Sequence, residues 1–140
     1  MASSALLLDS SFLFALNNVD DTYHRRATQY IGRDNRRQVI PDVVLTEVAY
    51  LLKTNVGQNA VLDFLDELIT PGISLQALSP TDVIRAREIM ATYADARLDF
   101  VDCCIMALSE RLEVTRVCTF DRRDFAIFRP KHCPYLELLP

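Results

Sequence analysis

Glycine is scarce in this sequence, which has only three glycines among 140 residues. Gly32, Gly57 and Gly72 stand far apart, so they cannot form the glycine-rich loop that cradles a phosphate in dinucleotide-binding folds. A Rossmann-type cofactor enzyme is therefore disfavoured. Repeats, linkers and low-complexity segments are also missing, and the length is that of one domain spanning residues 1–140.

The sequence also lacks the cysteine spacing of a zinc site. None of its four cysteines forms a CxxC pair, and three of them fall in apolar runs. We therefore expect buried, reduced thiols of the kind found in cytoplasmic proteins. The four are Cys103, Cys104, Cys118 and Cys133.

No apolar run is long enough to cross a membrane. The apolar start, residues 5–16, is broken by Asp9 and follows no basic residue, so it does not read as a signal peptide. The net charge of -4 and the pI near 5.1 argue against a general positive field for nucleic acid. Arginines cluster locally within residues 25–37 and at 122–123, where a solvated surface is the plainest interpretation. We expect a cytoplasmic protein without a membrane contact.

Short apolar runs alternate with helical patterns along the whole chain. The runs predict strands at 5–8, 39–40, 73–78, 116–119 and 135–139. Helices are predicted at 12–16, 22–31, 42–56, 59–69, 80–93 and 100–108, with Asp42 and Ser79 as N-caps of two of them. This alternation predicts an α/β fold, a three-layer α/β/α sandwich around a mostly parallel sheet.

Asp102 interrupts a segment, Phe100 to Leu108, that is otherwise apolar on every side of a helix. An ionised carboxylate in a buried helix must be paired or must bind a cation, which favours a functional role. The plainer alternative makes Asp99 the N-cap and places Asp102 in a capping-box-like position. Asp124 can be explained in the same way, as the cap of a turn.

Glu47 is the second acid in an unexpected place. It lies inside the apolar stripe of its helix, at i+3 from Val44, although a glutamate at the edge of the stripe can also reach water. Asp9 and Asp121 each follow a predicted strand directly, while Glu47 and Asp102 fall in the first turns of helices. Carboxyl ends of parallel strands and first turns of the next helices share one side of such a sheet, so these four acids should converge there.

Four carboxylates in one pocket repel one another unless a proton or a cation neutralises them. With no histidine or cysteine beside them the ligands are all oxygen, a set that selects Mg²⁺ or Mn²⁺. Such ions can activate water against a phosphodiester, so the pattern indicates a nuclease site. Ser11 could hydrogen-bond a water or a phosphate there, although a capping role is the simpler one.

Three segments carry a resemblance to a known family. LLLDSSFLFAL, PDVVLTEVAYLL and LDFVDCCIMALSERLEVTRVCTFDRRDF resemble, in order, the signature regions of PIN-domain ribonucleases, especially the VapC toxins of toxin-antitoxin pairs. The resemblance implies that Asp9, Glu47, Asp102 and Asp121 are the metal-binding and catalytic acids, and that Asp99 and Asp124 match acids of more variable role. Ser10 stands where such proteins frequently have threonine. The resemblance to this family further implies an endoribonuclease that uses Mg²⁺ or Mn²⁺ and acts on RNA. It also implies that the protein forms a homodimer and is inhibited by a VapB-type antitoxin.

Other functions stay open at this point. A haloacid-dehalogenase-like phosphatase needs a second aspartate two residues after the first, where Ser11 stands. A PIN-like module that only binds nucleic acid or a partner would use the acids as caps. DNA also remains a candidate substrate, because no residue visibly reads a 2′-hydroxyl. The apolar segment Phe12 to Leu16, beside the arginine-rich segment, predicts a groove in which an apolar helix of an antitoxin could dock. A basic residue of the antitoxin would then enter the pocket of acids.

Overall fold

The fold is described by a computed structural model, in which residues 4–140 are placed well enough to be described. The strands are β1 (Leu6–Leu8), β2 (Gln38–Pro41), β3 (Ile73–Gln76), β4 (Arg116–Cys118) and β5 (Glu137–Leu139). The α-helices are α1 (Ser10–Asn17), α2 (His24–Arg33), α3 (Leu45–Asn55), α4 (Gln58–Glu67), α5 (Pro80–Thr92), α6 (Phe100–Arg111) and α7 (Arg123–Ile127). Two short 3-10 turns, η1 (Asp42–Val44) and η2 (Ala94–Ala96), complete the fold.

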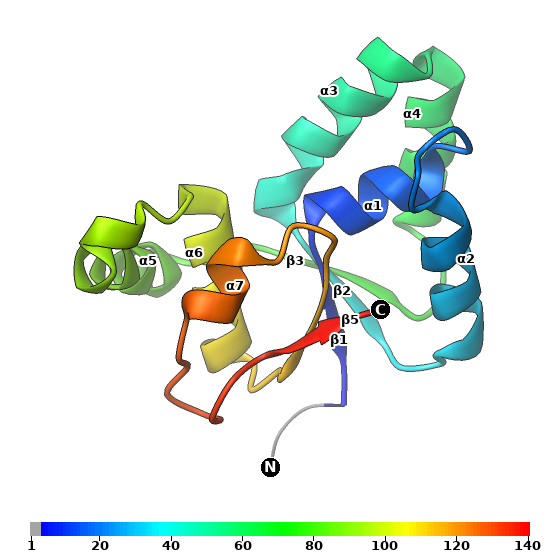
Figure 1. Cartoon of the computed structure of the whole chain (residues 1–140). Helices are drawn as coiled ribbons and strands as arrows, with labels where there is room; N and C mark the ends of the chain where they lie inside the picture. The colour runs from blue at the N-terminus through cyan, green and yellow to red at the C-terminus, as the bar shows by residue number, and fades with distance from the viewer. Residues whose placement is uncertain (1–3) are drawn as a thin grey trace.

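The strands form one sheet in the order β3-β2-β1-β4-β5, and all four pairings are parallel. In Figure 1, α5, α6 and α7 lie on one side of the sheet and α1 and α2 on the other, while α3 and α4 form a hairpin that rises beyond it. The predicted three-layer sandwich is therefore confirmed. The chain builds the sheet outward from β1 to β3 and then returns to place β4 on the other side of β1. The strand order thus reverses between β1 and β4, where open α/β sheets bind ligands.

Strand β1 is central because it can be buried on both faces. Leu6, Leu7 and Leu8 have no exposed surface, as expected for a strand with covered faces in a parallel sheet. The register pairs Leu8 with Cys118, so the next residues of the two strands, Asp9 and Thr119, leave the sheet at the same level. The fold therefore brings two polar residues together at the switch point.

Helix α6 is buried along most of its length, as predicted. Residues 102–109 are all inaccessible or nearly so, and the helix packs between the sheet and α5. Phe100 differs from the expectation, since it is 44% exposed at the start of the helix. The carboxylate of Asp102 thus enters the protein on an apolar helix, which needs a compensating partner.

The start of α5 also agrees with the sequence. Ser79 and Asp82 form a capping box in which each side chain accepts the other residue's backbone N–H. Asp82 is buried and is also held by both donors of the Arg111 guanidinium at 2.9 Å. This buried acid is therefore paired with a cation within the fold.

The predicted cap at Asp42 is wrong. Asp42 belongs to the 3-10 turn η1, its Oδ1 accepts the backbone N–H of Leu78 at 3.2 Å, and α3 begins at Leu45 without a side-chain cap. The preceding residue, Pro41, is the last residue of β2. Asp42 was misassigned because its partner is 36 residues away in sequence, beyond the reach of a local capping pattern.

The predicted docking surface on α1 also needs correction. Phe12 has no exposed surface and Leu13 only 2%, so these side chains form the core and cannot meet a partner protein. Only Phe14 and Leu16 of that apolar segment are partly accessible. Helix α1 presents its apolar face inward because it crosses the sheet directly after β1.

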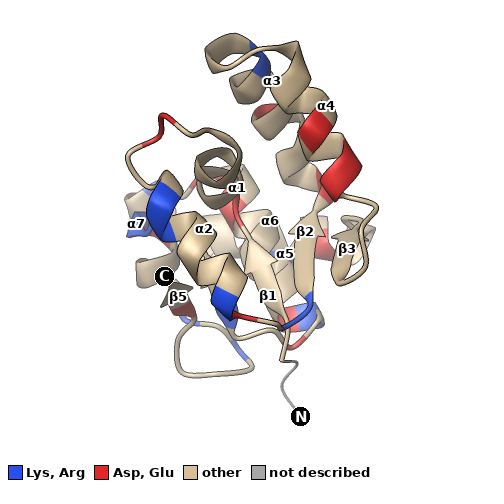
Figure 2. Ribbon diagram, turned by 90° about the vertical axis from the view of Figure 1, so that its right-hand side faces the viewer, with Lys and Arg blue, Asp and Glu red and all other residues tan. Residues whose placement is uncertain are grey.

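Charges are divided among the elements of the fold. In the ribbon of Figure 2, positions of Lys and Arg (blue) fall on α2 and near α7, while positions of Asp and Glu (red) mark α4. Arg25, Arg26 and Arg33 of α2 are exposed, in agreement with the solvated surface expected for them.

The thiols behave as predicted. Cys103, Cys104 and Cys118 are buried, Cys133 is partly buried, and all four are free. Burial raises the pKa of Cys118 to about 12, so its thiol stays protonated and unreactive at neutral pH. Within residues 4–140 there is no helix with the length and apolar character that a membrane crossing requires.

Candidate functional site

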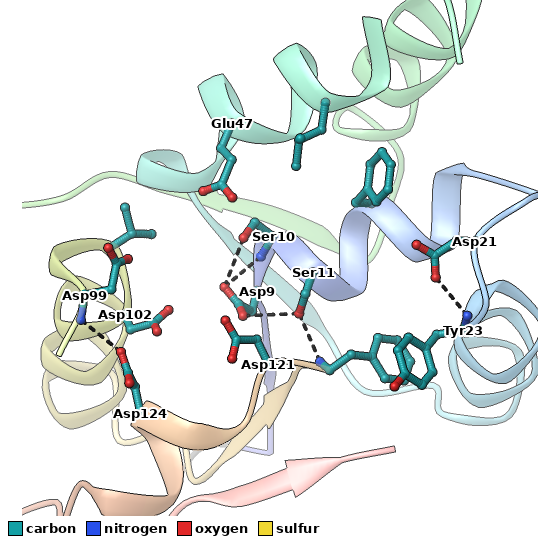
Figure 3. Close-up of a pocket in the computed structure, with 14 residues that line it drawn as sticks. Asp9, Ser10, Ser11, Asp21, Tyr23, Glu47, Asp99, Asp102, Asp121 and Asp124 are labelled. Carbon is teal, nitrogen blue, oxygen red and sulfur yellow. Dashed lines mark hydrogen bonds between the residues drawn. The ribbon is translucent and has the colours of Figure 1, made fainter. Parts of the chain in front are cut away.

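A cavity of about 420 Å³ opens at the switch point of the sheet. It lies beyond the carboxyl end of β1, between the first turns of α3 and α6 (Figure 3). All seven candidate residues from the sequence line it, and they come from four segments of the chain: Asp9, Ser11, Glu47, Asp99, Asp102, Asp121 and Asp124. The expected convergence of the acids is therefore present in the fold.

Asp9 is held rigidly at the base of this cavity. It ends β1, is only 2% exposed and caps α1 by accepting the Ser10 N–H at 2.7 Å. The Thr119 hydroxyl donates to its other oxygen at 2.7 Å, and the Ser11 hydroxyl does so at 3.4 Å. Burial raises the pKa of Asp9, the negative charges of Asp121 and Glu47 raise it further, and the bonds from Thr119 and Ser10 oppose the shift.

Thr119 is a site residue that the sequence analysis missed. Its buried hydroxyl donates to Asp9, lies 3.1 Å from the Ser11 hydroxyl and accepts the backbone N–H of Asp121 at 3.0 Å. The Ser11 hydroxyl in turn accepts the N–H of Phe120 at 2.9 Å. Thr119 therefore ties the end of β1 to the end of β4. The sequence did contain a signal for Thr119, since it is the polar residue at the end of the predicted strand 116–119, two residues before Asp121.

Asp102 enters the cavity from the first turn of α6 and is 8% exposed. Burial raises its pKa to about 9, helped by the negative charge of Asp9 and by a hydrogen bond with Asp124. Asp102 is thus protonated at neutral pH in the metal-free protein. A carboxyl group in a cavity whose pKa is raised this far by burial and neighbouring charge is typical of a functional site.

The capping expected of Asp99 and Asp102 is absent. Asp99 occupies the N-cap position of α6, but its side chain accepts no capping bond. Its backbone N–H instead donates to Asp124 at 2.9 Å, and Asp124 is itself held by the Arg123 guanidinium at 2.7 Å. Asp124 is 7% exposed. It therefore caps α6 from the start of α7, and Asp102 takes no part in the cap.

Glu47 and Asp121 lie at the rim and are exposed. Figure 3 shows Glu47 projecting from α3 toward the space that Asp9, Asp102 and Asp121 also face. The exposure of Glu47 is compatible with the simpler interpretation of an acid that reaches water. Its position over the cavity, where Leu51 of the same helix also lies, is compatible with the functional one.

The acids share the cavity without forming a preformed coordination sphere. Within the described part of the chain, no three histidine, cysteine, aspartate or glutamate side chains are arranged so that they could hold a metal ion as they stand. Like charge adds to burial at the two deepest acids: the charge of Asp9 raises the pKa of Asp102, and the charges of Asp121 and Glu47 raise the pKa of Asp9. A cation would remove this repulsion, and the oxygen donors suit a hard divalent ion.

The stability of the metal-free protein should fall as the pH rises. Asp102 has a pKa of about 9 when folded and an ordinary value of 3.8, so the folded state holds the extra proton. Its contribution is complete below about pH 4 and is lost as the pH rises through about 9. We expect the melting temperature in EDTA to decrease between pH 5 and 9, and Asp102→Asn to decrease less steeply. If the melting temperature of Asp102→Asn fell with pH as steeply as that of the exposed control Asp66→Asn, the pH dependence would not originate from Asp102.

An aromatic wall closes the other end of the cavity, and the sequence analysis missed it as well. Tyr23 and Phe120 line the cavity and stack with ring centroids 4.4 Å apart. Asp21 holds the Tyr23 backbone N–H at 2.8 Å. Tyr23 carried no sequence signal: it fell inside the helix predicted at 22–31, whereas it lies in the turn before α2, and its stacking partner Phe120 is distant in the sequence.

Comparison with known proteins gives consistent results. A sequence model of the PIN domain matches residues 6–129. Ribonuclease VapC26 of Mycobacterium tuberculosis is 28% identical over 125 residues, which cover 89% of this chain and 93% of that protein. Mycobacterium tuberculosis VapC20, described as a sarcin-ricin loop cleaving toxin, superposes with a TM-score of 0.83 at 20% identity, covering 96% of this chain and 99% of that one. DNA-bound VapBC from Salmonella typhimurium gives a TM-score of 0.66 at 16% identity, with 99% and 97% coverage.

Proposed function

Because this chain belongs to the PIN domain family, we propose that it is a metal-dependent endoribonuclease and the toxin of a toxin-antitoxin pair. The observation that carries the proposal is the meeting of Asp9, Glu47, Asp102 and Asp121 in one cavity at the switch point of the sheet. The ribonuclease VapC26, similar over 89% of this chain, supports RNA as the substrate.

The metal assignment rests on the donor set. Asp9 and Asp102 are buried acids whose pKa values are raised by burial and by neighbouring carboxylates, a repulsion that a divalent cation would neutralise, and the carboxylate donors in the cavity are hard oxygens. Glu47 and Asp121 are exposed, so their side chains can turn toward an ion without opening a hole in the core. Mg²⁺ or Mn²⁺ held by these residues would supply positive charge beside the scissile phosphate and would lower the pKa of a water molecule there.

The other residues of the site position the metal-binding acids. Thr119 and the N-terminal N–H of α1 fix the orientation of Asp9, so that its carboxylate is preorganised at the base of the cavity. Asp102 must release its proton when a cation binds, which couples binding to pH. Asp124 fixes the start of α6, and thereby Asp102, through the Asp99 N–H. Ser11 joins the two strand ends, a positioning role that accounts for its place beside Asp9.

Cleavage of RNA is the direct test of this function. The purified chain should cut a pool of single-stranded RNA of randomised sequence in Mg²⁺ or Mn²⁺ and should be inactive in EDTA. A DNA pool of the same design tests the alternative substrate, which remains open because no residue visibly recognises the 2′-hydroxyl. Cleavage that persists in EDTA would refute the metal-dependent mechanism. If no nucleic acid is cut in any metal, the alternative of a PIN module that only binds is favoured.

We also propose a VapB-type antitoxin as partner and a homodimer as the working assembly. The fold neighbours include a toxin-antitoxin complex from Klebsiella pneumoniae and a DNA-bound VapBC from Salmonella typhimurium. Since Phe12 is buried, an inhibitory segment would have to meet the partly accessible Phe14, which lines the acidic cavity. A basic side chain entering there would neutralise the acids in place of the cation.

A further inference from the structure

Tyr23 presents an exposed aromatic ring at the rim of the acidic cavity. It immediately precedes α2, is 43% exposed and lines the cavity. Its backbone N–H donates to the Asp21 carboxylate at 2.8 Å, a turn that fixes the start of the helix. Tyr50 and Tyr135 are more exposed than Tyr23, but neither lines the cavity, whereas the Tyr23 ring opens onto the proposed active site.

The orientation of the Tyr23 ring is set by a stack of three aromatic rings. Tyr23 lies on Phe120 with the planes 7° apart and the centroids 4.4 Å apart. Phe120 lies on Phe12 at 5.8 Å and 17°, and Phe12 is completely buried in the core. One side of the Tyr23 ring is therefore covered by Phe120, and its exposed surface faces outward on a rigid support.

The same stack is tied to the catalytic acids. Phe120 stands between Thr119 and Asp121, and its N–H donates to Ser11. Figure 3 shows Asp9 near the middle of the cavity, with Asp102 and Asp124 toward one end and Tyr23 at the other. A chain that crosses the cavity over the acids would thus reach the Tyr23 ring.

We propose that Tyr23 is a stacking platform for one unpaired nucleobase of the RNA substrate. The inference rests on the proposed nuclease function and adds a substrate-positioning residue to it. An uncharged ring binds a base without contributing to the charge of a cavity lined by acids, which by themselves repel the RNA backbone. A base must be free of a duplex to stack on a side chain, so the substrate is single-stranded at this nucleotide.

Binding can be observed directly because the chain contains no tryptophan. Tyr23→Trp places a single indole at the platform, and an Asp102→Asn background suppresses cleavage during the titration. A ten-nucleotide oligoadenylate in Mg²⁺ should quench this fluorescence, whereas the same backbone without bases should not. Tyr135→Trp is the matched control, since Tyr135 is 66% exposed and lies outside the cavity. Equal quenching of the two indoles, or none at Tyr23→Trp when the oligoadenylate is bound, would overturn the proposal.

Kinetics separate stacking from a purely structural role of Tyr23. Tyr23→Leu, which keeps apolar cover over Phe120, should raise KM for RNA at least about fivefold and lower kcat much less. Tyr23→Phe should restore KM, because it keeps the ring. A series of RNA substrates then carries one abasic nucleotide each, at successive positions on either side of the cleaved bond. One position should raise KM for wild type and not for Tyr23→Leu.

The outcomes also distinguish this inference from the function on which it rests. If wild type cuts no RNA, the proposed function fails, whatever Tyr23 does. If wild type cuts RNA and Tyr23→Leu has an unchanged KM, or responds to abasic sites as wild type does, stacking is refuted. A lower melting temperature with reduced kcat and unchanged KM would assign Tyr23 only a supporting role for Phe120, which also overturns the platform.

Discussion

Replacing Asp102 by Asn should reduce the rate of RNA cleavage at least about a hundredfold, the scale of loss when one preorganised transition-state group is removed. The change removes a charge and keeps the shape of a side chain that is only 8% exposed. Asp102 is protonated in the metal-free protein at neutral pH, so a neutral amide there should not disturb folding. The loss should appear in kcat under saturating Mg²⁺.

A control variant must show that the loss is local. Asp66→Asn changes an exposed acid on α4 outside the cavity and should cleave RNA like wild type. Circular dichroism should show the same helix content for wild type and both variants. Undiminished cleavage by Asp102→Asn would remove Asp102 from the site and return it to a structural role at the start of α6.

Mg²⁺ should raise the melting temperature of wild type strongly and that of Asp102→Asn much less. The unfolded chain holds no such site, so a ligand at a hundred times its Kd stabilises the folded state by about 2.7 kcal/mol. In EDTA at pH 7 the order of the two proteins should reverse, with Asp102→Asn melting higher than wild type. The reason is that wild type must take up a proton on Asp102 when it folds, whereas the amide has no such cost.

The two readings of the acids predict opposite results in this experiment. If Asp102 stabilised α6 as a dipole partner, Asp102→Asn would cost a few tenths to about 1 kcal/mol and melt lower in EDTA. Metal would then change neither protein. That combination of results would count against the nuclease assignment. Asp66→Asn is again the control, because it shows how the loss of an acid outside the cavity changes the melting temperature.

Much of the site could be predicted because its acids carry local signals. Asp9 follows a fully apolar strand and Asp102 interrupts a fully apolar helix, so both stand out in the sequence. Parallel strands then bring strand ends and helix starts to one edge, as the fold shows. The fold class followed from the same alternation of elements.

The parts that could not be predicted depend on partners distant in sequence. Asp124 caps a helix that begins 24 residues earlier, and Asp42 accepts a bond from Leu78, so local capping rules assigned both wrongly. Tyr23 reaches the cavity only because Phe120 returns beside it from the far end of the chain. Phe12 looked like an accessible apolar residue, but packing of α1 against the sheet buries it completely.

The most direct test of the account is the position of Mn²⁺ in crystals of the protein, located by its anomalous scattering. The account predicts a peak in the cavity, with carboxylate oxygens of Asp9 and Asp102 at about 2.0 to 2.6 Å, the bonding range of hard divalent cations. Glu47 or Asp121 should turn toward the same peak. A protein that cleaves RNA in Mn²⁺ while its crystals show the ion bound elsewhere, with these four acids unengaged, would contradict the central claim.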